Sequence, residues 1–89
     1  MTSMRGADLA EMQNMAQAFG REAGQLQEII QRLNSERAKI GTVWTGPGAQ
    51  RFGESWDTAR GSFTKMVQAL HEAEQAIRTY QRNIESATQ

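Results

Sequence analysis

Apolar side chains recur through the first half of the chain at alternating steps of three and four residues. Ten of the eleven positions in this series are apolar: Leu9, Met12, Ala16, Phe19, Ala23, Leu26, Ile30, Leu33, Arg37, Ile40 and Trp44. Arg37 is the exception, and its long aliphatic stem can cover apolar surface while its head reaches water. A sustained 3.5-residue repeat predicts a long helix that packs along a left-handed seam.

The second half repeats the pattern without exception. Its series is Ala49, Phe52, Trp56, Ala59, Phe63, Met66, Leu70, Ala73, Ile77, Tyr80, Ile84 and Ala87. We therefore predict an all-α fold with two helices, at about 8–42 and about 47–86, within a single domain that covers residues 1–89. Asp8 followed by Glu11 is typical of a helix N-cap with an acid in the first turn.

The stretch "TVWTGPGAQRF", residues 42–52, interrupts the two series and contains the only proline of the chain. Gly46 can adopt the left-handed backbone conformation that ends helices, and Pro47 suits a first helical turn. We therefore expect an antiparallel hairpin that is joined by a turn at Trp44, Thr45 and Gly46. Trp44 is either a bulky plug at the closed end of this hairpin or a recognition residue.

Four glycines, Gly20, Gly24, Gly53 and Gly61, fall well inside the predicted helices, away from their ends, and outside the two series. Glycine inside a helix costs about 1 kcal/mol relative to alanine. These positions are either tolerated surface glycines or places where another helix approaches closely.

The apolar surface is broader than one partner helix can bury. Met15, Ile29 and Val43 recur every fourteen residues beside the first series, and Val67 widens the second. On the second helix a line of small residues runs parallel to the series at Ser55, Ser62, Ala69 and Ala76. A lone hairpin would expose a large aromatic patch, so we predict that two hairpins pair into a four-helix bundle dimer. The residues expected in the hairpin and dimer core are Phe19, Leu26, Ile30, Leu33, Phe52, Trp56, Phe63, Leu70 and Ile77. Whether the partner is a copy or a related chain is left open.

Composition excludes several kinds of site. Ten acidic and ten basic residues cancel, and residues 1–43 already carry five of each, so no basic stripe is present to bind nucleic acid. The chain has no cysteine and one histidine, His71, which argues against a metal centre or a catalytic triad. No phosphate loop, nucleophile elbow or dinucleotide fingerprint is present. We therefore expect no cofactor and no enzymatic activity.

The first residues, "MTSMRGADLAEMQ", lack the apolar core of a cleavable signal peptide. No stretch approaches the roughly 18 apolar residues that a membrane span requires. These two features predict a soluble chain that does not insert stably into a membrane.

The motif Trp44-Thr45-Gly46, in a central turn between two long heptad helices, resembles that of the W-x-G family of roughly hundred-residue bacterial proteins, also called the early-secreted-antigenic-target-like family. The resemblance covers essentially the whole chain. It implies helical hairpins that pair as homodimers or heterodimers in a four-helix bundle. It also implies export of the folded dimer through the type VII (ESX) system of Gram-positive and actinobacterial cells, without a cleaved signal peptide, and recognition by the membrane ATPase of that system.

In this family the export signal has two parts, the W-x-G turn and a tyrosine followed four residues later by an acid. Trp44 and Gly46 match the first part. The second part departs from the pattern, because Ile84 stands four residues after Tyr80 and the acid, Glu85, comes one position late. Either the chain is the tailless member of a heterodimer or the sequence ends before an intact signal; we favour the first. Because Tyr80 belongs to the apolar series, we also expect it in the core.

Two other functional classes stay open at this point. One is an intracellular coiled-coil interaction module that is merely similar to the family. The other is a membrane-active helical protein, because amphipathic helices can lie in a bilayer interface. The near-zero net charge argues against the second of these classes.

Overall fold

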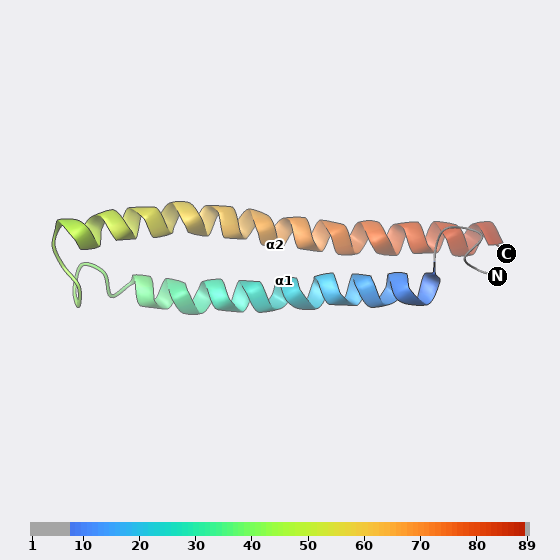
Figure 1. The fold of residues 1–89 in the computed structure, drawn as a ribbon, viewed down its shortest axis with the longest axis horizontal. Helices are drawn as coiled ribbons and strands as arrows, with labels where there is room; N and C mark the ends of the chain where they lie inside the picture. The colour runs from blue at the N-terminus through green and yellow to red at the C-terminus, as the bar shows by residue number, and fades with distance from the viewer. Residues whose placement is uncertain (1–7, 89) are drawn as a thin grey trace. The chain divides into compact units, whose positions relative to one another are not determined.

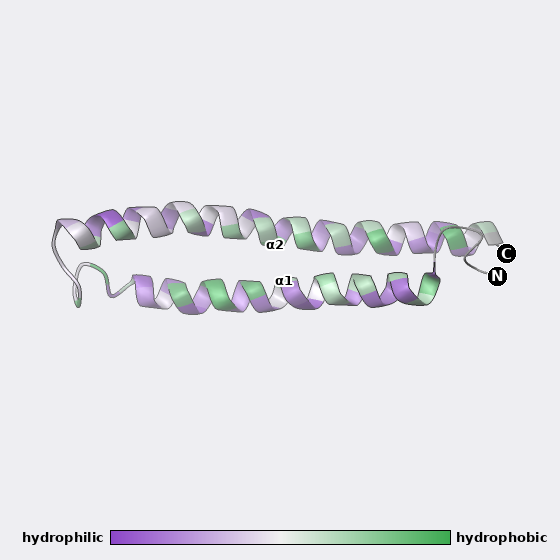
Figure 2. Ribbon diagram, viewed as in Figure 1, coloured by the Kyte–Doolittle hydropathy of each residue, from purple (hydrophilic) through white to green (hydrophobic). Residues whose placement is uncertain are grey.

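The computed structural model describes residues 8–88, which form two α-helices and no β-strand. Helix α1 spans Leu9–Arg37 and helix α2 spans Pro47–Thr88. The helices run antiparallel and pack against each other (Figure 1). Both alternate apolar and polar surface along their length (Figure 2), as the sequence pattern requires. The predicted all-α, antiparallel two-helix hairpin is confirmed.

The start of each helix follows the predicted local chemistry. Asp8 caps α1: its Oδ1 accepts a hydrogen bond from the Glu11 N–H at 3.2 Å, and its carbonyl accepts one from the Met12 N–H at 2.8 Å. Gly46 has φ of 104°, a conformation that favours glycine, and Pro47 is the first residue of α2. Proline has no backbone N–H, but this costs no hydrogen bond here, because the N–H groups of a first helical turn have no acceptor within the helix.

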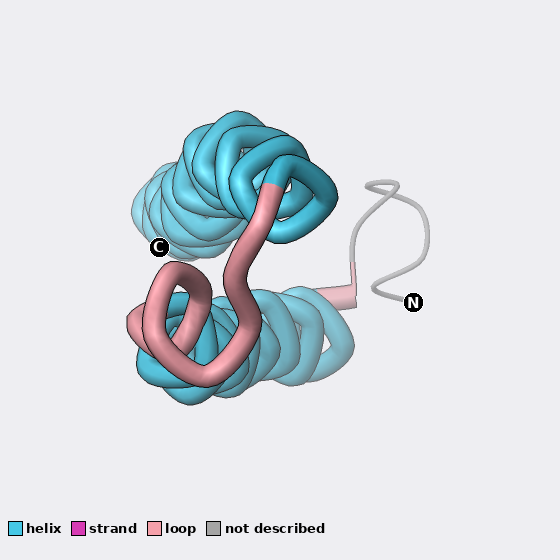
Figure 3. The backbone as a smooth tube through the Cα atoms, turned by 90° about the vertical axis from the view of Figure 1, so that its left-hand side faces the viewer, coloured by secondary structure: helices cyan, strands magenta, loops and turns pink. Residues whose placement is uncertain are grey.

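The predicted end of the first helix, at residue 42, is wrong, because α1 ends at Arg37. A second glycine with positive φ, Gly41 at 103°, stops the helical path, and residues 38–46 form a connection of their own. The connection coils over the end of α1 before it crosses to α2 (Figure 3). Its hydrogen bonds are local: the Val43 N–H donates to the Lys39 carbonyl at 2.8 Å and the Gly41 N–H donates to the Trp44 carbonyl at 2.7 Å.

The helical residues group into two compact units. The first, which we call the turn unit, is Gly24–Val67. Its buried positions are Ile30, Ala49, Gly53 and Val67, so small side chains hold much of the contact between its helical segments. Small residues allow two helices to approach closely. Several larger apolar residues of this unit lie on its surface instead.

The second, the terminal unit, pairs the described residues before Gly24 with those after Val67. Ala16 and Ala23 are its fully buried side chains. The half-buried carboxylate of Glu74 lies over Gly20 and contacts the Arg78 guanidinium at 3.2 Å. The amide of Gln81 donates to the Leu9 carbonyl at 3.3 Å, which links the end of α2 to the beginning of α1.

The helical glycines divide between the two interpretations that the sequence left open. A Cβ at Gly20 would lie 2.7 Å from a carboxylate oxygen of Glu74, and one at Gly53 would lie 2.9 Å from the guanidinium carbon of Arg37. These two glycines therefore mark close approaches. Nothing lies within 4 Å of a Cβ built at Gly24 or Gly61, so these two are tolerated glycines.

This division gives a matched pair of substitutions. Gly61→Ala should raise the free energy of unfolding by about 1 kcal/mol, the usual gain of alanine over glycine in a helix. Gly53→Ala should raise it by distinctly less, because the new methyl group displaces Arg37 from its ion pair, worth roughly 0.2–1 kcal/mol at an exposed site. Urea unfolding at one protein concentration measures both, and equal gains would contradict this account of Gly53.

Candidate functional site

The contact between the helices of the turn unit includes only part of each apolar series. Ile30 and Ala49 of the two series are buried in it. Asn34, Gly53 and Arg60, each one position beyond a series residue, also take part. Leu33 and Phe52, which immediately precede Asn34 and Gly53, are turned aside. Leu33 is consequently 46% exposed and Phe52 is 53% exposed. The turn unit therefore buries mainly small and β-branched residues and leaves large apolar side chains such as Leu33 and Phe52 on its surface.

Trp44 lies in the connection between the helices and is 49% exposed. Its ring packs against Phe52 with 5.6 Å between centroids and an angle of 46° between planes, a tilted arrangement that aromatic pairs favour. The backbone carbonyl of Trp44 accepts a hydrogen bond from the Gly41 N–H. Half of the indole is thus anchored to α2, while the other half is available to a partner.

An apolar groove of about 430 Å³ lies beside Trp44. Its floor is apolar and its rim carries Glu36 and Lys39, whose carboxylate and ammonium groups are 3.0 Å apart. The groove is lined by Leu33, Glu36, Arg37, Lys39, Ile40, Val43, Trp44, Phe52 and Trp56. An apolar floor with a polar rim is the usual form of a protein-docking surface.

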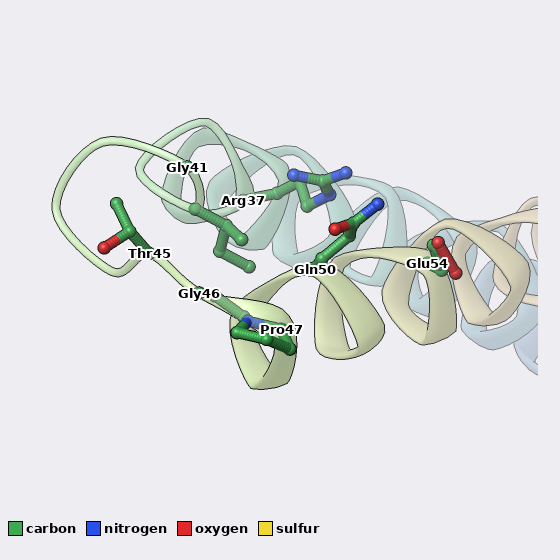
Figure 4. A pocket seen from close by; sticks show the side chains of 9 residues that line it. Arg37, Gly41, Thr45, Gly46, Pro47, Gln50 and Glu54 are labelled. Carbon is green, nitrogen blue, oxygen red and sulfur yellow. The ribbon is translucent and has the colours of Figure 1, made fainter.

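A second hollow, of about 650 Å³, lies where the connection meets the start of α2 (Figure 4). Backbone at Gly41 and Gly46 forms one part of it, and Arg37, Gln50 and Glu54 bring polar side chains to another. Both signs of charge and exposed backbone border this hollow beside the apolar Ile40 and Pro47, so it offers more polar contacts than the groove does.

Two polar links fix the helices of the turn unit beneath these surfaces. Arg37 forms a two-pronged contact with Asp57, Nε to Oδ1 and Nη2 to Oδ2, each at 3.2 Å. The Oδ1 atom of Asn34 accepts from the Trp56 indole N–H at 3.4 Å and from Arg60 Nη1 at 3.1 Å. The links orient Trp56 and hold the two helical segments in register.

The predicted core residues occupy three environments in the single chain. Ile30 is buried, Leu33 and Phe52 are exposed, and the others are half-buried: Phe19, Leu26, Trp56, Phe63, Leu70 and Ile77. Tyr80 is 62% exposed in the single hairpin, and its expected place in the core of a paired bundle stays a prediction. Glu85 is exposed. Thr45 and Gly46 line the polar hollow, and Trp44 lines the apolar groove.

Sequence reasoning missed the polar links. Arg37 stood out as the one charged residue in an apolar series, which signalled a special position. No sequence feature marked Asn34 or Asp57, which come immediately after the series residues Leu33 and Trp56. The sequence does not distinguish a polar residue at such a position that faces solvent from one that faces a second helix.

Other kinds of site find no support in residues 8–88. No group of three or more His, Asp or Glu side chains in this part of the chain is arranged to hold a metal ion. Neither helix, over the residues described, has a stretch apolar enough and long enough to cross a bilayer.

Asp57 gives the turn unit a dependence on pH. The hydrogen bonds from Arg37 hold the pKa of the Asp57 carboxyl below its ordinary value of 3.8, and the charges of Arg37 and Arg60 add to the shift. A carboxyl whose pKa is lowered by folding stabilises the folded state above its ordinary value. That contribution disappears as the pH falls through the lower folded value.

We therefore expect the stability of the wild-type chain to fall more steeply below about pH 4 than that of Asp57→Asn, with the two curves converging in acid. Glu28→Gln, which removes another exposed acid of the same unit, controls for the loss of one negative charge. Chemical denaturation across the acid range checks this. Parallel curves for wild type and Asp57→Asn would show that the Arg37 contact does not couple folding to pH.

Comparison with known proteins agrees with the geometry at the turn. A family model described as WXG100, proteins of 100 residues with WXG, matches residues 6–89. Protein YukE of Bacillus subtilis (strain 168) is 25% identical over 79 residues, which cover 89% of this chain and 81% of that protein. No solved structure matched the chain. The chain therefore belongs to the WXG100 family of small, helical, secreted proteins associated with type VII systems.

Proposed function

We propose that this protein is exported as a folded dimer by a type VII secretion system, and that the membrane ATPase of that system recognises it through Trp44, Thr45 and Gly46. The observation that carries the proposal is the half-exposed indole of Trp44, which borders an apolar groove at a turn. Membership of the WXG100 family supports export, because the family consists of secreted proteins.

The groove is suited to recognition because its parts are already in place. Phe52 supports the indole from α2, and Trp56, beneath them, is oriented by Asn34. A partner that buries the free half of the indole gains apolar contact area without having to order these side chains, and such ordering is a main cost of association. Tryptophan is also the residue type most enriched among those that dominate binding energy at interfaces.

Export as a dimer is supported by the exposed apolar residues of the turn unit. Ile29, Leu33 and Met66 are each between 43% and 50% exposed within the turn unit. Water contact with several large apolar residues on one helical pair is unfavourable, at about 25 cal/mol for each Å² left exposed. A second hairpin can cover these residues and complete a bundle.

The second element of the signal is proposed to involve Tyr80 and Glu85. The exposure of Tyr80 makes its ring accessible to another protein, in keeping with recognition rather than hairpin packing. The acid that follows is displaced by one helical position from the family pattern, so its carboxylate is rotated by about 100° around the helix. A related chain with an undisplaced acid would supply the missing geometry in a heterodimer.

Trp44→Ala should abolish most export while costing little stability. Removing a half-exposed tryptophan should lower the free energy of unfolding by roughly 1–2 kcal/mol, less than the 3–5 kcal/mol typical of a buried one. Binding to the ATPase should weaken on the order of tenfold or more, as for the loss of a central aromatic anchor. The measurements are the amount of protein in culture filtrate and binding to the purified ATPase.

The matched control is Ile77→Ala, which removes a half-buried apolar side chain of the terminal unit and does not alter any residue that lines the groove. It should destabilise the fold at least as much as Trp44→Ala and yet leave ATPase binding intact. If export follows stability alone in both variants, the turn has no separate role in recognition. Failure of the wild-type chain to reach the culture filtrate would support an intracellular interaction module instead.

A further inference from the structure

The apolar groove beside Trp44 has the size and lining of a small-molecule site. Its volume is about 430 Å³, and pockets that bind small molecules usually have roughly 300–1,000 Å³, mostly apolar walls and a few polar groups. Three of its nine lining residues are charged, and the other six are apolar: Leu33, Ile40, Val43, Trp44, Phe52 and Trp56. This composition suits a ligand with an apolar body and one polar end.

The walls of the groove are held in place by contacts within the turn unit. On the side of the connection, the Lys39 carbonyl accepts hydrogen bonds from the backbone N–H groups of Thr42, Val43 and Trp44, at 3.2, 2.8 and 3.3 Å, respectively. On the side of α2, the Phe52 ring packs against the indole of Trp44. A ligand that enters the groove therefore does not have to order these side chains, which is a main cost of binding.

The charged residues of the groove favour an anionic ligand, because two of them are cations and one is an anion. Arg37 is engaged by Asp57 through two contacts of 3.2 Å. The Lys39 ammonium contacts the two carboxylate oxygens of Glu36, at 3.0 and 3.1 Å, on the exposed rim. An ammonium group has three N–H donors, so one donor of Lys39 is left for the carboxylate of a ligand.

We propose that the groove binds a single-chain amphiphile with a carboxylate headgroup, such as a medium-chain fatty acid. Its alkyl chain lies along the indoles of Trp44 and Trp56, and its carboxylate meets the ammonium group of Lys39. An unbranched chain is flexible enough to follow an open groove between a helix and a loop. The ligand site goes beyond the proposed function and does not depend on it, because it requires only the groove of the turn unit.

The ligand is proposed to be the monomeric acid rather than a lipid that remains in a bilayer. Glu36, Arg37 and Lys39 line the groove together with its apolar residues. A bilayer that reached the apolar floor would have to remove all three charged groups from water, which is costly. A single alkyl chain can reach the same floor and leave these groups hydrated.

Intrinsic fluorescence tests this directly, because Trp44 and Trp56 are the two tryptophans of the chain and both line the groove. Decanoate, added to the full-length chain below the concentration at which it forms micelles, should shift the emission to shorter wavelength and saturate at one molecule per chain. Octanoate should bind roughly tenfold more weakly, because two fewer methylene groups leave water. Titration calorimetry gives the stoichiometry.

The two lysines of the chain, Lys39 and Lys65, provide a matched pair of variants. Lys39→Gln should weaken decanoate binding about two- to fivefold, the effect of one exposed ion pair, and leave the binding of uncharged 1-octanol unchanged. Lys65 is exposed in the same unit and does not line the groove. Lys65→Gln should therefore change the affinity for neither ligand.

A third variant closes the groove without disturbing the fold. Val43 lines the groove and is 80% exposed, so Val43→Glu should be tolerated. The new carboxylate repels the headgroup and loses its own hydration when the chain enters, which should weaken decanoate binding on the order of tenfold or more. Ser62→Glu adds the same charge at an exposed position outside the groove and should have no effect. Circular dichroism confirms that each variant is folded.

Three results would overturn the proposal: no saturable fluorescence change with decanoate, an affinity for decanoate that Lys39→Gln leaves unchanged, or a response to vesicles of phosphatidylcholine and phosphatidylglycerol in place of decanoate. None of these results depends on export or on ATPase binding. Conversely, a chain that binds decanoate in the groove and is not exported would support the ligand site and refute the proposed function.

Discussion

The structure depends on where the two helices touch. In the turn unit their contact uses one side of each apolar series and the residues next to it, so that Gly53 and Ala49 allow close approach and Asn34 and Arg37 make directional bonds. Because only that side is covered, large apolar side chains such as Leu33 and Phe52 stay on the outer side. A hairpin of this kind is well defined in register but leaves much of its apolar surface uncovered.

Directional contacts and apolar contacts have different effects in this arrangement. Apolar burial is proportional to area and tolerates sliding by a heptad, whereas the two-pronged Arg37–Asp57 pair and the shared Asn34 acceptor fit only one register. At an exposed position such bonds add modest stability. Their main consequence is positional: they place Phe52 under Trp44 and thereby define the groove at the turn.

The sequence predicted the fold well and the surfaces less well, for a physical reason. Periodicity identifies which residues share a stripe, and cap chemistry at Asp8, Gly46 and Pro47 locates the ends of helices. It does not say which edge of the stripe faces a helix of the same chain and which faces another molecule. Tyr80, expected in the core, is therefore exposed in the single hairpin. The early end of α1 was missed because Ile40 and Trp44 stay apolar to cover the end of the helix while Gly41 turns the backbone away.

The same arrangement of the helix contact connects pairing with recognition. Leu33 and Phe52 belong to the exposed series that a second hairpin would cover, and both also line the groove beside Trp44. A partner packed on that series would change how much of these two side chains the groove displays, and would build one wall of it from its own residues. A receptor that binds in the groove would then distinguish the paired state from the single hairpin without contacting the rest of the helices. Export restricted to folded dimers would follow from this geometry, because an unpaired chain presents the tryptophan but not the complete surface around it.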